Sequence, residues 1–257
     1  FRYPPTTRAS RAIEAQDMGM GFLNSSILAN SERARAIALF TDGRMVLGGH
    51  TNNGSKEQFG LMVLHADGSF DTSFNTNGKR AESVGSTDDF IHAVAIQTDG
   101  KVVTAGRAKN YNIDFQMHRY QTNGSLDTSW STDGKQLTEI NDNTDIARSI
   151  AILTDGRVVA GGYSWWFGRY NYAAARYQTN GNLDTSFQTT GKHTVLLSAT
   201  DNGALGMAIT PNQSVVLTGS TFNGSDFDFG VLRLWSDGNL DTSFSTDGKT
   251  AAAVTAA

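Results

Sequence analysis

A motif of Asp, Thr, Ser and an aromatic residue occurs four times in this chain and restricts what it can fold into. The Asp residues of successive copies lie 56, 57 and 57 residues apart in a chain of 257 residues. A constant period of this length is typical of solenoids, propellers and other arrays of one supersecondary unit. Residues common to all units are therefore expected to be scaffold, and function is sought in what one unit has alone. The copies of this signature begin at Asp71, Asp127, Asp184 and Asp241.

Each unit is predicted to contain four strands. A Thr-Asp-Gly-Arg/Lys marker lies between two apolar runs at residues 41–44, 98–101 and 154–157, and Pro211-Asn212-Gln213 replaces it in the fourth unit. An Asp-Gly step between such runs predicts a tight hairpin turn. A third alternating segment, a second Asn-Gly or Asp-Gly turn, the signature, a Gly-Lys step and a weaker fourth strand follow. One unit is therefore predicted to be a four-stranded antiparallel meander.

Tandem four-stranded units predict the blades of a propeller. We expect an all-β protein, a β-propeller of four or five four-stranded antiparallel blades, with an N-terminal segment at residues 1–30 and the repeat region at residues 31–257. The units cover about residues 33–88, 89–144, 145–201 and 202–257.

The two ends of the chain present a conflict in the strand count. An extra strand is predicted at Gly21 to Leu28, and it competes with a C-terminal strand near Lys249 to Val254 for one outer position of a four-bladed ring. Three alternatives stay open: residues 1–30 serve another purpose, the chain is part of a longer array, or a terminal strand pairs with another subunit.

The joined motifs resemble the delta-60 repeat family of bacterial proteins. The resemblance rests on Ala-Ile-Ala-Leu-x-Thr-Asp-Gly-Arg, Asn-Gly-Ser-Leu-Asp-Thr-Ser and Thr-Asp-Gly-Lys, and covers about residues 33–250. It implies a propeller-like array in an exported protein, secreted or in the cell envelope, with no established catalytic residue to transfer.

Composition excludes several classes of site and partner. The chain has no Cys, so disulfides and thiolate metal sites are excluded. Its net charge is −4 and its basic residues are scattered, so nucleic acid is not an expected partner. No apolar run is long enough for a membrane span. The five His residues lack paired ligand spacing, and the loop acids at 88–89, 142–145 and 226–228 are interpreted as solvated turn residues, so we expect no metal and no cofactor.

The shared polar residues are interpreted as structural. An Asp in the signature turn is suited to cap backbone N–H groups while the aromatic ring packs between sheets. Arg119, Arg176 and Arg233 lie eight residues before a signature Asp, where the first unit has Val63. They either form an anion-binding ring about the axis or pair with a neighbouring Asp, and pairing is favoured.

The third unit alone has an aromatic segment, from Tyr163 to Tyr172, where the other units have polar residues. Exposed rings beside an Arg suit stacking on sugars or anchoring a protein interface. The alternative is a loop that folds over a blade edge or closes one end of the channel. The predicted ligand-binding residues are Trp165, Trp166, Phe167, Arg169, Tyr170 and Tyr172.

The leading functional hypothesis is a non-enzymatic structural or binding module for adhesion or recognition. The alternatives are a lectin with one carbohydrate site per blade, and a hydrolase or lyase that acts on glycans through acids around the axis. The expected partners are a protein or a glycan at the surface, and a second copy of the chain bound through terminal strands.

Overall fold

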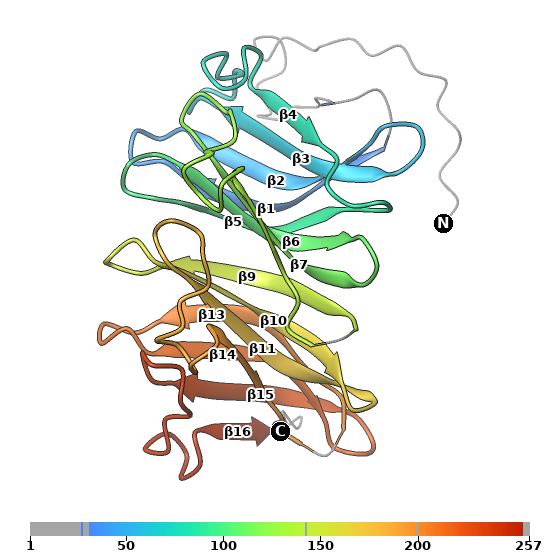
Figure 1. Cartoon of the computed structure of the whole chain (residues 1–257), viewed down its shortest axis with the longest axis vertical. Coiled ribbons are helices and arrows are strands. Elements are labelled where there is room, and N and C mark those ends of the chain that lie inside the picture. The colour runs from blue at the N-terminus through green and yellow to red at the C-terminus, as the bar shows by residue number, and fades with distance from the viewer. Residues whose placement is uncertain (1–26, 28–30, 142, 199, 254–257) are drawn as a thin grey trace.

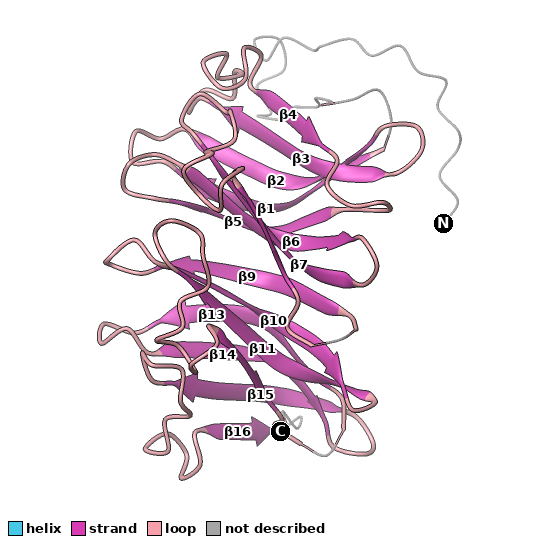
Figure 2. Cartoon of the chain, in the orientation of Figure 1, coloured by secondary structure: helices cyan, strands magenta, loops and turns pink. Residues whose placement is uncertain are grey.

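The computed structural model describes residues 27, 31–141, 143–198 and 200–253, and these residues form strands and turns without a helix (Figure 2). Sixteen strands form four antiparallel sheets, each a meander in sequence order, as predicted. Blade 1 contains β1 (Glu32–Leu39), β2 (Met45–Asn52), β3 (Glu57–Leu64) and β4 (Lys79–Glu82). Blade 2 contains β5 (Phe90–Ile96), β6 (Val102–Lys109), β7 (Ile113–Tyr120) and β8 (Lys135–Thr138).

Blade 3 contains β9 (Asp145–Ile152), β10 (Val158–Trp166), β11 (Arg169–Tyr177) and β12 (Lys192–Val195). Blade 4 contains β13 (Asn202–Ile209), β14 (Val215–Phe222), β15 (Phe227–Leu234) and β16 (Lys249–Ala252). The first strands lie at the inner edge, where β1 contacts β5, β5 contacts β9 and β9 contacts β13. The chain is therefore an all-β protein whose four sheets are the blades of a β-propeller.

Each inner strand contains a β-bulge near its start. The register between the first two strands shifts at one residue in every blade, and these bulge residues are Arg35, His92, Arg148 and Leu205. A glycine of the second strand lies opposite each bulge; at Gly106, for example, a Cβ would lie 1.9 Å from the carbonyl oxygen of Phe90. Only glycine fits there, which explains why the second strand of every blade carries one.

The hydrophobic core is divided into three layers, one between each pair of neighbouring blades. The signature aromatic residues Phe74, Trp130 and Phe187 are at most 1% exposed within these layers. Each layer joins residues about one repeat apart. Packing between blades, rather than within one sheet, therefore forms the core.

The four blades form an open arc in the described part of the chain. Blade 1 and blade 4 lie at opposite ends of the long axis (Figure 1), and no interface comparable to those between successive blades joins β13 to β1. The predicted C-terminal strand is β16, which pairs with β15 and fills the outer position of blade 4. The predicted strand from Gly21 to Leu28 lies outside the described residues, apart from Ile27.

Candidate functional site

The signature Asp residues are buried and bonded to the scaffold. Asp127 is 1% exposed; its Oδ1 accepts hydrogen bonds from the Ser129 hydroxyl (2.6 Å) and backbone N–H (3.2 Å), and its Oδ2 from Arg119 Nε (2.8 Å). The same contacts recur at Asp184, with Arg157 added. Burial alone would raise the pKa of Asp184, but these donors outweigh it and lower that pKa to about 2. The structural interpretation of the signature agrees with this geometry.

The three in-phase arginines pair with these Asp residues. Arg119, Arg176 and Arg233 each donate Nε to the Asp of their own blade. Arg119 Nη1 also reaches the carbonyl of Thr179 in the next blade (2.7 Å), and Arg176 bonds the Ser236 carbonyl in the same way. Arg119 and Arg176 therefore connect neighbouring blades, and the expected pairing with Asp is confirmed for all three arginines.

The interpretation of the loop acids is wrong for two of them. Asp89 and Asp145 are fully buried, not solvated. Asp145 accepts hydrogen bonds from the backbone N–H groups of Ile140 (2.6 Å) and Asn141 (3.1 Å), so it caps the linker that enters blade 3, and Asp89 does the same before blade 2. Asp88 and Asp226 are exposed, as expected. In the ranges that the structure describes, no three His, Asp or Glu residues are placed to hold a metal ion.

The aromatic segment of the third unit is a regular β-hairpin rather than the expected variable loop. β10 and β11 pair as far as Trp166 opposite Arg169, and Phe167 and Gly168 form the two-residue turn with φ of 49° and 78°. Positive φ at both positions is the geometry of a tight hairpin turn. β10 and β11 have 9 residues each, against 8 in the equivalent strands of the other blades, so the sheet itself carries the aromatic residues to its end.

Five of the six predicted site residues lie together at this hairpin tip, but Tyr172 does not. Trp166 is 45% and Phe167 78% exposed, and their rings are 4.5 Å apart. Trp165 contacts Tyr170 edge to face at 4.7 Å. Tyr172, in contrast, is fully buried between blades 3 and 4, where its hydroxyl donates to the Gly230 carbonyl (3.0 Å). Its ring lies on the same face of β11 as Tyr170 but further from the tip, where residues of blade 4 cover it.

A cluster of basic residues that the sequence analysis did not single out lies at the inner edge of blades 1 to 3. We define this basic cluster as Arg35, His92, Arg107 and Arg148. Arg35 and Arg107 both lie over the Phe90 ring, at 5.4 and 4.6 Å. Arg148 reaches His92 Nδ1 (3.4 Å) and donates to the Tyr163 hydroxyl (2.8 Å). Residues of three blades thus converge on one position.

The guanidinium groups of the basic cluster form no ion pair with a described residue. Among the described residues, no acid lies within ion-pair distance of Arg35, Arg107 or Arg148. Burial, followed by the charge of Arg148, lowers the pKa of His92 to about 3. Because His92 Nδ1 faces a guanidinium donor, its proton lies on Nε2. The Nε2–H group of His92 and the Nε–H group of Arg148 are buried and have no hydrogen-bond partner in the described part of the chain. Both are donors, so the basic cluster offers hydrogen bonds to an acceptor.

The basic cluster and the aromatic hairpin are continuous. Tyr163 bonds Arg148 on one side and contacts Tyr170 at 5.1 Å on the other, and Tyr170 in turn contacts Trp165. A row of guanidinium groups and rings therefore extends from the inner edge to Trp165, whereas Trp166 points to the opposite face of the hairpin. A sequence signal existed: Arg35, His92 and Arg148 all precede the first turn's Asp by seven residues. Their convergence depends on the bulge, which periodicity does not reveal.

The comparisons with known proteins agree with this architecture. A family model described as "Domain of unknown function (DUF5122) beta-propeller" matches residues 41–74, 97–129, 153–187 and 211–244, together more than half of the chain. The chain belongs to this family. The predicted repeat-based β-propeller family is thereby confirmed, whereas the delta-60 name stays a prediction. Comparison with curated protein sequences gives no significant match.

Several solved structures are similar at low sequence identity. A protein of unknown function from Dyadobacter fermentans matches with a TM-score of 0.52 and 9% identity, over 84% of this chain and 63% of that one. This chain thus spans less than two thirds of that protein. An endo-1,4-beta-xylanase from Bacteroides thetaiotaomicron (TM-score 0.48, 12% identity, 86% and 72% covered) and a protein of unknown function from Bacteroides caccae (0.44, 11%, 86% of each) are also similar. At this identity the first likeness shows the fold alone.

Proposed function

We propose that this protein is a non-enzymatic recognition module of an exported bacterial protein and that it binds an acidic glycan. The observation that carries the proposal is the continuity of the Tyr163, Tyr170 and Trp165 rings with a basic cluster that makes no ion pair within the described ranges. The partly exposed rings of Trp165 and Tyr170 in this row offer flat apolar surfaces to sugar faces. Guanidinium groups bind carboxylate or sulfate through charge-assisted hydrogen bonds.

The alternatives from the sequence receive less support. A lectin with one site per blade needs shared residues that are free to bind, but the shared Asp and Arg residues are bonded to each other. A glycan hydrolase or lyase needs acids near the axis, and the described inner edge places cations there. The delta-60 resemblance supports export. Within the described ranges, no helix is long and apolar enough to cross a membrane.

The experiment is calorimetric titration of the parent chain with oligosaccharides that carry uronic acid or sulfate groups, and with neutral oligosaccharides of equal length. We expect binding of the acidic series alone, weakened by added salt. Arg148→Gln should reduce affinity tenfold or more, because a hydrogen bond to a charged group contributes about 1.5–3 kcal/mol. Trp165→Ala should also weaken binding.

Tyr111→Ala is the matched control, because Tyr111 is a 97% exposed ring in a different blade. It should bind as the parent does. Equal binding of neutral and acidic oligosaccharides would refute the role of the basic cluster, and the absence of any glycan binding would refute the proposal. Thermal unfolding of each variant establishes that the fold persists.

A further inference from the structure

Each blade has two different faces. We call the face toward the following blade the trailing face and the face toward the preceding blade the leading face. On the trailing faces, the third strand places an aromatic ring in the core, and Phe59, Phe115 and Tyr172 are at most 1% exposed. The equivalent residue in blade 4 is Phe229, which is 62% exposed, and Phe227 beside it is 63% exposed. The trailing face of blade 4 therefore presents a core position without its partner blade.

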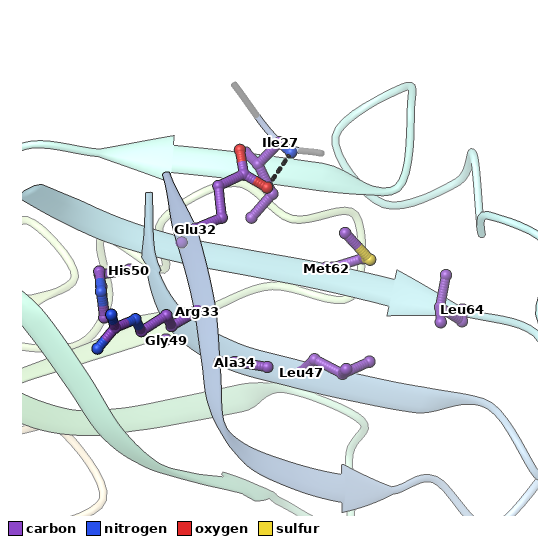
Figure 3. Close-up of a pocket in the computed structure, with 11 residues that line it drawn as sticks. Ile27, Glu32, Arg33, Ala34, Leu47, Gly49, His50, Met62 and Leu64 are labelled. Atoms are coloured by element: carbon purple, nitrogen blue, oxygen red, sulfur yellow. Dashed lines mark hydrogen bonds between the residues drawn. The ribbon is translucent and has the colours of Figure 1, made fainter. Parts of the chain in front are cut away.

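In the described part of the chain, no blade covers the leading face of blade 1. Ile37 is 60% exposed, whereas the equivalent Val94 of blade 2 is 9% exposed. Beside it, Leu47, Met62 and Leu64 line a groove of about 250 Å³, shown in Figure 3. Residues equivalent to Leu47 are at most 1% exposed in the other three blades (Thr104, Ala160 and Leu217). The positions equivalent to Leu47, Met62 and Leu64 are thus buried wherever a preceding blade is present, and those equivalent to Ile37 are at least partly buried.

Among the described residues, the backbone hydrogen bonds between blades likewise lack a donor's partner at one end of the arc and an acceptor's partner at the other. After each signature, a backbone N–H bonds a turn carbonyl of the next blade: Asn75 to Asn123 (2.8 Å), Ser131 to Asn180 (2.7 Å) and Gln188 to Asp237 (2.9 Å). The corresponding groups are the Ser245 N–H in blade 4 and the Asp67 carbonyl in blade 1, at opposite ends of the arc.

A glycine follows each acceptor turn and receives the preceding blade's aromatic ring. A Cβ at Gly181 would lie 2.7 Å from Trp130, and one at Gly238 would lie 2.8 Å from Phe187. A Cβ at Gly68 in blade 1 would meet nothing within 4 Å. The place for a ring such as Phe244 is therefore present on blade 1 and open.

Ile27 shows that the leading face of blade 1 accepts groups from a preceding blade. It occupies the same repeat position as Val84, Ile140 and Leu197, the linker residues that precede blades 2, 3 and 4. A Cβ at Gly60 would lie 3.1 Å from Ile27 Cδ1, as a Cβ at Gly230 would lie 2.7 Å from Leu197 Cδ2. The labelled residues of Figure 3 show Ile27 over one end of the groove, bonded to Glu32.

We propose that two copies of this chain associate head to tail, with the trailing face of blade 4 of one copy packed on the leading face of blade 1 of the other. The contact repeats the register of the internal interfaces: Phe229 enters the groove beside Leu47 and Met62, and Ser245 N–H bonds the Asp67 carbonyl. We assign both faces to a second copy of this chain because they are complementary. The apolar side chains and backbone groups left uncovered on one face are those that the other face would contact. Such a heterologous contact closes into a ring of copies or extends as a chain.

The first measurement is the solution mass of the parent chain by light scattering across a concentration series. We expect a mass of at least twice the 27.6 kDa of one chain. Phe229→Asp and Ile37→Asp should each reduce self-association at least tenfold, since each places a charge in one half of the contact. Both side chains are exposed in the single chain, so the fold is expected to survive.

A mixing experiment tests the head-to-tail arrangement. The Phe229→Asp variant retains an intact blade 1 and the Ile37→Asp variant an intact blade 4, so an equimolar mixture should form dimers through one intact interface. Tyr111→Asp is the control for a charge at an exposed ring elsewhere and should associate as the parent does. A parent that stays monomeric at high concentration overturns the proposal and indicates that a further repeat of the same polypeptide covers these faces. Association that Phe229→Asp abolishes but mixing does not restore also overturns it.

Discussion

Replacement of Asp127 by Ala is the most informative perturbation of the scaffold. The carboxylate is 1% exposed, and it holds the Arg119 guanidinium, whose side chain is only 6% exposed, together with the Ser129 turn. The variant leaves a buried cation without its counter-charge, which costs about 3–5 kcal/mol. Lys101 also contacts Asp127, at 3.4 Å, but is 24% exposed and adds at most about 1 kcal/mol.

Thermal and urea-induced unfolding followed by circular dichroism measure this effect. At about 2 °C per kcal/mol for a chain of this size, the melting temperature should fall by roughly 6–10 °C. Asp133→Ala is the matched control, because Asp133 is an exposed turn residue of the same blade that caps Lys135 N–H (2.9 Å). It should cost within about 1 kcal/mol.

A double variant separates the cost of leaving the Arg119 charge unpaired from the cost of losing the other Asp127 contacts. Combining Arg119→Met with Asp127→Ala removes the unpaired charge, so the pair should be less destabilised than the sum of the single variants, by about 0.5–3 kcal/mol. An Asp127→Ala variant with parental stability and lost ligand binding would refute the structural reading of the signature and identify it as a binding residue.

Three further predictions concern pH and backbone geometry. Burial raises the pKa of Asp114 to about 6, above that of an unfolded Asp, so its charged form destabilises the fold; the melting temperature should rise as pH falls from 7 to 5, and Asp114→Asn should reduce this dependence. The pKa of Asp184 is about 2, so its stabilising effect is complete above about pH 4 and is lost as pH falls toward 2; urea midpoints of Asp184→Asn should show a weaker acid dependence than the parent. Gly106→Ala should abolish cooperative unfolding, because its Cβ would lie 1.9 Å from the Phe90 carbonyl oxygen, whereas Gly206→Ala, whose nearest neighbour would be 3.3 Å away, should unfold much as the parent does.

The repeat pattern predicted the candidate binding surface only in part. The departure of one unit from its repeat correctly drew attention to residues 163–172, and Trp166 and Phe167 are exposed as a binding site requires. The same reasoning included Tyr172, which lies two residues further from the tip than Tyr170 and is covered by blade 4. It did not include Arg148, because the first-strand bulge that brings this side chain beside His92 leaves no mark in a hydrophobic pattern.

The sequence by itself determined the blade: its period, its turns and the meander of four strands follow from local patterns that repeat, since Asn-Gly and Asp-Gly steps set hairpins within a few residues. The pairing of Arg119 with Asp127 was also predictable, because both belong to one unit. Only the tertiary structure decided what lies between units. It placed Arg35, His92 and Arg148 of three blades together, and it left Phe229 uncovered while its equivalents are buried. These outcomes depend on which blade is a neighbour, and a residue's own repeat carries no information about that.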